Sequence, residues 1–483
     1  MSDKVITLAE VKERKNAILG RCNIYNRQGV PVSINQNEIK KCILEQNNIV
    51  FIDNVLHTYY SGVYMIDRYS KQTLHFIECC MEENLVTAQR KKAVLDLLQQ
   101  DYTIEKDYKS INRYDNAIIN FKNTMFNVAT FEYIEHDREY ISTIQIPHNL
   151  KKISIDKDID VKDIIRKRVK DDKLHPNFSN LLLAQELKDD DIEMILQMIG
   201  VSMTKDDRYK SLAFVTGESD TGKSIFFNTI GAICGDDNIS YVDIHDIVED
   251  KFQNAEMLNK IVNIASDNDK RPITDTGKIK KLSGKDGMNV QKKHKDPIKA
   301  KFFATLWNSF NEMPILNDQS NAMYRRLRVV AMKKPVAKDK QDKRLEEKIL
   351  LEIPEIIISC LYALHLAYKN GLEITDSKTS IHEKRALQEN SDSVQAFINN
   401  GLELNTTNKI KVTECYNAYK EYYESESASG KYYERKNFKK IMLNKGYQIV
   451  KSNGIDMYTG IDIAWKTADI ELIERFEKVV KRK

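Results

Sequence analysis

The spacing of apolar residues changes along the chain and divides it into regions of different predicted structure. Residues 1 to about 120 combine short strand-like runs, such as NNIVFIDN, with a helical period in QRKKAVLDLLQQ. A more strand-rich stretch, NAIINFKNTMFNVATFEYI, follows directly. The first part of the chain is therefore predicted to mix helices and strands.

From Asn177 to about Asn370 the pattern predicts alternating strands and helices. DDDIEMILQMIGVSM opens with three acids, which suit the positive end of a helix. SLAFVTG is a continuous apolar run, typical of a strand buried on both faces. Strands that alternate with helices indicate a parallel sheet covered by helices.

The last ~95 residues have the pattern of a small separate domain. KIKVTECYNAYKEYYESE predicts a helix, and ERKNFKKIMLNKGYQIVKSNGIDMYTGIDI predicts helix, strand, turn and strand. This order is typical of a winged helix.

These patterns predict a multidomain α/β protein with four parts. We expect an α+β domain over residues 1–180, an α/β domain over 181–375, a linker over 376–390 and a winged-helix domain over 391–483. A length of 483 residues is consistent with about three domains.

The composition bears on the cellular compartment of the protein and on the partners that it can bind. With 41% hydrophobic residues the chain can bury real cores, and a net charge of +4 means that any basic surface is local. The N-terminus has no apolar signal core and we find no run of about 18 apolar residues, so we predict a cytoplasmic protein with no membrane partner. The seven cysteines contain no C-x-x-C pair and predict reduced structural thiols, with neither zinc nor a disulfide framework. They are Cys22, Cys42, Cys79, Cys80, Cys234, Cys360 and Cys415.

The stretch GESDTGKS fits the phosphate-binding pattern G-x-x-x-x-G-K-[ST] without deviation. Glycines let backbone N–H groups approach phosphates, Lys223 would pair with the β- and γ-phosphates, and Ser224 would hold Mg²⁺. The predicted ATP contacts are Gly217, Glu218, Ser219, Asp220, Thr221, Gly222, Lys223 and Ser224.

Acids and asparagines end the next apolar runs. In KIVNIASDND, Asp267 would complete the Mg²⁺ shell and Asp269 would orient or deprotonate the attacking water, although an Asp after a strand also serves as a cap or turn. In KAKFFATLWNSFNEMP, Asn308 or Asn311 could bind the γ-phosphate or its water, or simply end the strand.

AMYRRLRVVAM places three arginines before another apolar run. Arginine is the residue that stabilises phosphoryl-transfer charge from an adjacent subunit, and a basic edge on a buried strand is the alternative interpretation.

The order of these motifs resembles that of the superfamily 3 helicases, and more closely the phage, plasmid and poxvirus primase–helicase class. The chain has KKLSGKD, NEMP and YRRL in the family's order after the P-loop, and the similarity covers roughly residues 180–335. The resemblance implies a homo-hexameric AAA+ motor that uses ATP and Mg²⁺ to unwind DNA.

The resemblance also implies roles for individual residues. Asn311 matches the sensor asparagine, with Asn308 as the alternative, and Arg326 matches the arginine that acts on the neighbouring subunit, with Arg325 and Arg328 next. Two departures are visible: residues 1–180 lack room and acidic triads for a full primase domain, and the two acids are separated by Asn268.

Two basic clusters are predicted to bind DNA. In NVQKKHKDP, the resemblance places Lys292, Lys293, His294 and Lys295 on a β-hairpin in the ring's channel, where they would hold single-stranded DNA; a solvated turn is the alternative. In the C-terminal helix, a groove-binding face is favoured over a solvated one, and its basic residues are Arg435, Lys436, Lys439 and Lys440.

The leading hypothesis is an ATP-dependent replicative helicase and initiator of a bacterial mobile element, binding single- and double-stranded DNA at a replication origin and working with host replication proteins. A sequence-specific DNA-binding regulator with a P-loop switch and no unwinding is the alternative. A protein-remodelling P-loop ATPase is a third.

Overall fold

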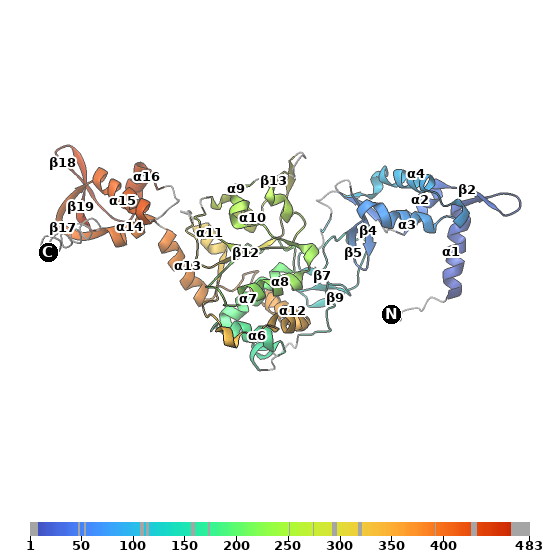
Figure 1. The fold of residues 1–483 in the computed structure, drawn as a ribbon, viewed down its shortest axis with the longest axis horizontal. Helices are drawn as coiled ribbons and strands as arrows, with labels where there is room; N and C mark the ends of the chain where they lie inside the picture. The colour runs from blue at the N-terminus through green and yellow to red at the C-terminus, as the bar shows by residue number, and fades with distance from the viewer. Residues whose placement is uncertain are drawn as a thin grey trace.

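The computed structural model describes residues 8–464 except for residues 47–48, 53–54, 107–110, 113–114, 156–159, 172–173, 251, 274, 292–296, 317–320, 392 and 427–431. It is a multidomain mixed α/β protein with several sheets. Figure 1 shows the N-terminal and C-terminal regions on opposite sides of a central region.

The N-terminal region packs helices on a four-stranded sheet with strand order β5-β4-β3-β6. Its core joins apolar side chains of the sheet, such as Ile49 and Leu56, to Ile39, Ile77 and Leu98 of the helices. Its elements are α1 (Leu8–Cys22), β1 (Asn23–Tyr25), β2 (Pro31–Ile34), α2 (Gln36–Glu45), β3 (Ile49–Ile52), β4 (Val55–Tyr60), β5 (Val63–Ile66), α3 (Lys71–Cys79), α4 (Ala88–Gln99) and β6 (Glu105–Lys106).

A small antiparallel sheet connects this region to the central one. It consists of β7 (Ile118–Asn120), β8 (Met125–Asn127) and β9 (Glu132–Ile134). Its apolar residues belong to the core of the central region, because Phe126 and Val128 cluster with the central helices and the Phe131 ring lies 5.1 Å from that of Tyr362. The boundary that we predict near residue 180 therefore lies within one continuous core.

The central region is built on a five-stranded sheet with order β11-β12-β15-β10-β16. Every pairing in it is parallel, which confirms the parallel sheet predicted from the alternating pattern. Its strands are β10 (Leu212–Thr216), β11 (Ile239–Ser240), β12 (Val262–Asn268), β15 (Thr305–Phe310) and β16 (Leu327–Ala331).

Helices cover both faces of this sheet, so side chains along each strand alternate between two cores. On β15, Trp307 packs into the core of one face, while Leu306 and Phe310 pack into the other. The first face carries α6 (Pro176–Leu183), α7 (Asp189–Ser202), α8 (Lys223–Cys234) and α12 (Leu345–Lys369), and the second carries α9 (Ile244–Glu249), α10 (Thr276–Ser283) and α11 (Asn321–Arg326).

Helix α12 is long and apolar enough to cross a membrane by length and composition, although Glu352 and Glu355 interrupt its apolar run. An 18-residue window of it is 72% buried, and it packs against α7 and α8. Its apolar character is that of a central core helix.

The C-terminal region has its own core, in which the rings of Tyr419 and Phe438 stack 4.7 Å apart. Helix, strand, turn and strand follow as the pattern predicts, and Asn453 and Gly454 both adopt positive φ in the hairpin turn. The sheet has order β17-β19-β18, and β17 includes Lys409–Lys411, which we expected to begin a helix. The elements are α14 (Ser393–Gly401), β17 (Leu402–Lys411), α15 (Val412–Glu426), α16 (Arg435–Asn444), β18 (Ile449–Ser452) and β19 (Ile455–Ile463).

Helix α13 (Lys378–Ser391) occupies most of the segment that we predict as a linker. It packs along β16, where the backbone N–H of Val329 donates to the Ser380 hydroxyl at 3.0 Å. Leu387 lies in the core beneath the second face of the sheet.

Candidate functional site

The phosphate-binding pattern forms a tight loop between β10 and α8. A Cβ at Gly217 would come within 1.7 Å of the Met332 carbonyl oxygen, and one at Gly222 within 2.6 Å of the Leu181 Cδ1. Gly222 also adopts φ +89° immediately before α8 begins at Lys223. Both positions therefore require glycine, for space at the first and for space and backbone conformation at the second.

A buried glutamine outside the pattern holds this loop. Gln185 donates from Nε2 to the carbonyls of Thr221 at 3.0 Å and Lys334 at 2.9 Å, and its Oε1 accepts from the Lys334 N–H at 2.8 Å. The Val336 N–H donates to the Asp220 carbonyl at 2.8 Å. The loop is thus fixed to the chain that leaves β16, a contact that no sequence motif indicates.

Lys223 lies within the loop that it follows. Its ammonium donates to the carbonyls of Gly217 and, at 2.6 Å, of Glu218. Burial lowers the pKa of Lys223, and the negative charge of Asp267 opposes that shift. Ser224 is exposed in the first turn of α8. An ammonium and the first N–H groups of a helix suit the phosphates of a nucleoside triphosphate, and a hydroxyl beside them suits its Mg²⁺.

The two predicted acids have different surroundings. The register of β12 shifts between Ala265 and Asn268, which leaves Asp267 exposed and Asn268 buried. The Asn268 amide donates to the carbonyls of Ala265 at 3.0 Å and Ser309 at 3.2 Å, so it fixes the end of β12 against β15. The residue that separates the acids thereby sets their positions.

Asp269 is held by two cationic or titratable partners. Its Oδ1 lies 3.1 Å from His245 Nε2 and its Oδ2 accepts from Arg271 Nε at 2.6 Å. Burial would raise the pKa of Asp269, but the hydrogen bonds from Arg271 outweigh it and the pKa lies below its usual range. Asp269 is therefore ionised, and its orientation depends on His245, which the sequence did not point to.

The two asparagines differ in burial. Asn311 is exposed just beyond β15, at the same edge of the sheet as the loop. Asn308 is fully buried in β15, with neither side-chain polar atom hydrogen-bonded among the described residues. The sheet edge thus presents Asn311 to solvent, while Asn308 lies opposite Phe214 and Ala265 inside the sheet.

The three arginines lie in different environments. Arg326 donates to the Ala322 carbonyl at 2.8 Å within α11, and Arg328 donates to the Ile374 carbonyl at 3.0 Å. Burial lowers the pKa of Arg328. Arg325 is exposed. Arg325 is therefore the exposed one of the three, while Arg326 is half-buried at the end of α11 and its Nε is buried.

The two strands of the predicted hairpin are present. β13 (Met288–Val290) pairs antiparallel with β14 (Ile298–Ala300), which confirms the two strands. Lys292, Lys293, His294 and Lys295 lie outside the described residues, so their DNA-binding role stays a prediction.

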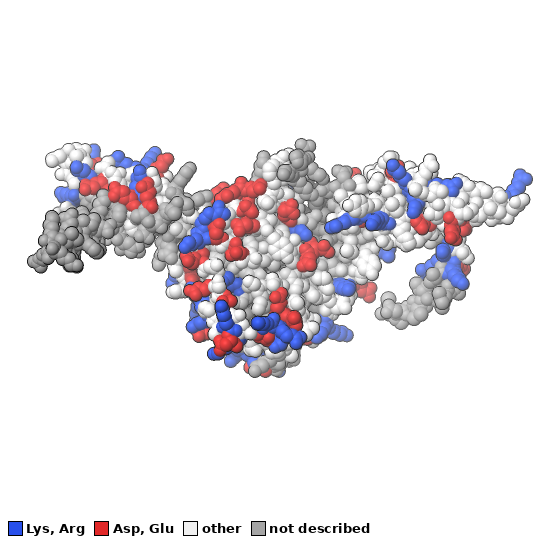
Figure 2. Space-filling view, viewed as in Figure 1, with Lys and Arg blue, Asp and Glu red and all other residues white. Residues whose placement is uncertain are grey.

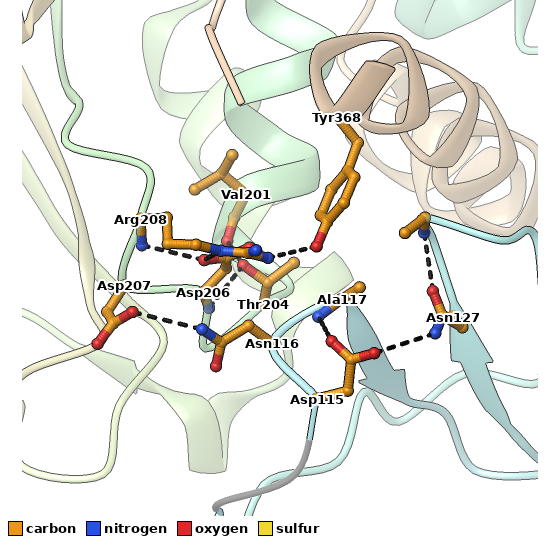
Figure 3. A network of polar contacts seen from close by, with 11 residues as sticks. Asp115, Asn116, Ala117, Asn127, Val201, Thr204, Asp206, Asp207, Arg208 and Tyr368 are labelled. Atoms are coloured by element: carbon orange, nitrogen blue, oxygen red, sulfur yellow. Dashed lines mark hydrogen bonds and ion pairs between the residues drawn. The ribbon is translucent and has the colours of Figure 1, made fainter. Parts of the chain in front are cut away.

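A polar network lies at the base of this hairpin (Figure 3). Asp207 accepts from Asn116 at 3.4 Å. Outside the view of the figure, Asp207 also pairs with Lys301, just beyond β14, at 3.2 Å. Arg208 makes paired hydrogen bonds to Asp206 and stacks its guanidinium 5.1 Å from the Tyr368 ring centre. We name Asp206–Arg208 the acidic turn; it joins the β7 segment, α12 and the hairpin base.

The basic helix of the C-terminal region exposes Arg435, Lys436 and Lys440. Lys439 instead pairs with Asp456 at 2.6 Å, which ties α16 to β19.

The surface charge is divided into patches of opposite sign. Figure 2 shows Asp and Glu side chains gathered over α9 and a band of Lys and Arg near α11. These patches are consistent with a net charge of only +4. Among the described residues, no group of three or more His, Cys, Asp or Glu is arranged to hold a metal ion.

Comparisons with known proteins give a family match over part of the central region. Residues 215–326, from β10 to α11, match a family described as a family of unknown function, DUF5906. No curated protein matches. Among the solved structures that are similar, three are of the apo NrS-1 C-terminal region. The A form covers 87% of this chain and 98% of its own at 12% identity and TM-score 0.48. The structure of residues 305–718 covers 88% and 98% at 12% identity and TM-score 0.47, and a further A form covers 87% and 98% at 13% identity and TM-score 0.45. At these values the similarity carries no argument about function.

Proposed function

We propose that the protein is an ATP-driven DNA helicase with an AAA+ motor domain, which assembles as a ring hexamer and initiates replication. The observation that carries the proposal is that the loop with Lys223, after β10, and the end of β12 with Asp267 lie at the carboxyl edge of one parallel sheet, where the charge of Asp267 acts on the pKa of Lys223. The strand order β16-β10-β15-β12-β11, with the loop after the second strand, is the AAA+ arrangement and supports the assignment.

Each residue at this edge has a role that its position allows. Lys223 and the loop N–H groups would bind the phosphates, Ser224 and Asp267 would hold Mg²⁺, and Asp269 would orient the attacking water. The magnesium ion would neutralise charge that develops on the phosphates.

Two further parts complete the proposed hydrolysis site. Asn311, exposed at the same edge, would contact the γ-phosphate, and Asn308 lies too deep in the sheet to do so without a rearrangement of β15. Arg326, with Arg325 beside it, would act on the nucleotide of the neighbouring subunit.

The C-terminal region would bind duplex DNA as a winged helix. The exposed Arg435, Lys436 and Lys440 would contact phosphates, while Lys439 would set the angle between α16 and the hairpin through Asp456. The tip of the β13–β14 hairpin would hold the single strand.

The test is ATP hydrolysis and strand displacement on forked DNA, with Lys223→Ala as the inactive control. We expect DNA-stimulated hydrolysis and unwinding, both lost in the variant because the γ-phosphate loses its cationic contact. DNA binding without displacement would favour the regulator with a P-loop switch. Hydrolysis that is indifferent to DNA would favour a protein-remodelling ATPase.

A further inference from the structure

Three buried thiols meet in the N-terminal region, at the ends and sides of three different helices. Cys22 closes α1, Cys42 lies in α2 and Cys80 follows α3. The Sγ atoms of Cys22 and Cys42 are 3.5 Å apart, and the Cys80 thiol is near enough to Cys22 for each to shift the pKa of the other. A disulfide S–S bond is about 2 Å long, so a shift of roughly 1.5 Å would join Cys22 to Cys42.

A cavity leads to this thiol cluster. It has a volume of about 830 Å³, and Cys42 and Cys80 both line it, as do the exposed Cys79 and its neighbour His75. A small oxidant therefore has space to reach the sulfur atoms, although the three thiols are 0 to 7% exposed.

The three thiols are not chemically equivalent. The hydrogen bond from Cys22 lowers the pKa of Cys80 and outweighs the opposite effect of burial. The same contact, together with burial, raises the pKa of Cys22, and burial raises that of Cys42 to about 11. One thiol is thus favoured as a thiolate nucleophile beside a protonated thiol that can resolve it.

We propose that Cys22, Cys42 and Cys80 form a peroxide-sensitive thiol site in which Cys22 becomes disulfide-bonded to one of its two neighbours. The Cys80 thiolate attacks the peroxide, an S–O bond forms, the O–O bond breaks, and hydroxide leaves and takes up a proton as water. The Cys22 sulfur then attacks the Cys80 sulfur, the S–O bond breaks, and the second oxygen leaves as water with the Cys22 proton. Two thiols lose two electrons, and hydrogen peroxide is reduced to two waters.

Cys42 gives this site a second stable form. Its sulfur touches that of Cys22, so thiol–disulfide exchange can move the bond from Cys22–Cys80 to Cys22–Cys42 without further oxidation. Either bond ties the end of α1 to another helix of the same core.

The test uses the full-length protein with Cys79→Ser, which removes the exposed thiol and leaves six of the seven cysteines. After treatment with hydrogen peroxide, thiols are titrated under denaturing conditions and peptides are mapped by mass spectrometry. We expect six thiols to fall to four, with a peptide that links Cys22 to Cys80 or Cys42. The thermal midpoint should rise and return to its starting value after reduction.

The matched control adds Cys22→Ser, which should give no cross-linked peptide after peroxide, because Cys80 can still be oxidised but the thiol that resolves it is absent. Six thiols that survive peroxide in the Cys79→Ser protein would overturn the proposal. So would a loss of thiols with no intramolecular link through Cys22. Cys79 is exposed, so its replacement leaves the core intact and the first protein alone decides the matter.

Discussion

At the scale of single residues, the phosphate loop depends on a side chain that lies outside its motif. Gln185 satisfies one carbonyl of the loop and both backbone groups of Lys334. Its loss would leave buried polar groups without partners, which is the costly way to break a hydrogen bond.

We expect Gln185→Ala to lower the free energy of unfolding by about 2 kcal/mol and to weaken ATP binding about tenfold. The KM for ATP should rise more than kcat falls, because the loop is loosened while the reacting groups remain. Steady-state kinetics and thermal melting measure both quantities. An unchanged KM in Gln185→Ala would show that the loop holds its shape without this clamp.

The two acids at the end of β12 can be separated by their magnesium dependence. Asp267→Asn should raise the Mg²⁺ concentration needed for half-maximal hydrolysis, because a ligand charge is lost. Asp269→Asn should lower kcat by about 100-fold or more with the Mg²⁺ requirement unchanged, because water activation is lost. Titrations of ATPase rate against Mg²⁺ distinguish the two, and the opposite pattern would exchange the roles.

At the scale of elements, α6 is joined to α12 through a buried histidine. His175 shares hydrogen bonds of 2.8 Å with the hydroxyls of Ser179 and Ser359. Burial, helped by the charge of Arg168, lowers the pKa of His175 from 6.5 to about 4. The unfolded chain therefore binds a proton more tightly than the folded one.

The sign of the pH effect follows from this shift. The contribution of neutral His175 to the free energy of unfolding is fully present above pH 6.5. It is lost as pH falls from 6.5 towards 4, which lowers the free energy of unfolding by up to about 3 kcal/mol. Chemical denaturation across that range measures it. His175→Gln should flatten the slope, whereas replacement of the exposed His382 should leave it unchanged. An equal slope in all three proteins would assign the acid sensitivity to other groups.

Elements with strong local signals were predictable, and elements that depend on distant contacts were not. The parallel strands, the loop with its two required glycines and the arms of the β13–β14 hairpin follow from apolar runs and turn residues. The positions of Gln185 and His245 could not be predicted, because their partners lie far away in the chain.

At the scale of the whole molecule, the acidic turn connects parts that lie far apart in sequence. Asp207 touches the β7 segment through Asn116 and the hairpin base through Lys301. If the hairpin binds DNA as proposed, its displacement would reach the central core through this turn.

We expect Asp207→Ala to leave basal ATPase within about twofold of wild type and to reduce its stimulation by single-stranded DNA severalfold, because a part-exposed pair contributes little to stability. Asp339→Ala, an exposed acid elsewhere, is the matched control. ATPase assays with and without DNA measure the difference. Full stimulation in Asp207→Ala would assign the coupling to another contact.

Strand β16 has a consequence for the timing of a ring. It begins directly after Arg326 and ends at the backbone that covers Gly217, and its five residues span roughly 16 Å. Because β16 is paired with β10 along all five of its residues, we expect it to move as one unit. In the proposed hexamer, a change at the subunit's own nucleotide, beside Gly217, would therefore also move Arg326, which acts on the nucleotide of the next subunit. The six sites would then hydrolyse ATP one after another around the ring, in one direction. A single inactive subunit would inhibit hydrolysis in its neighbour before it inhibited the other subunits.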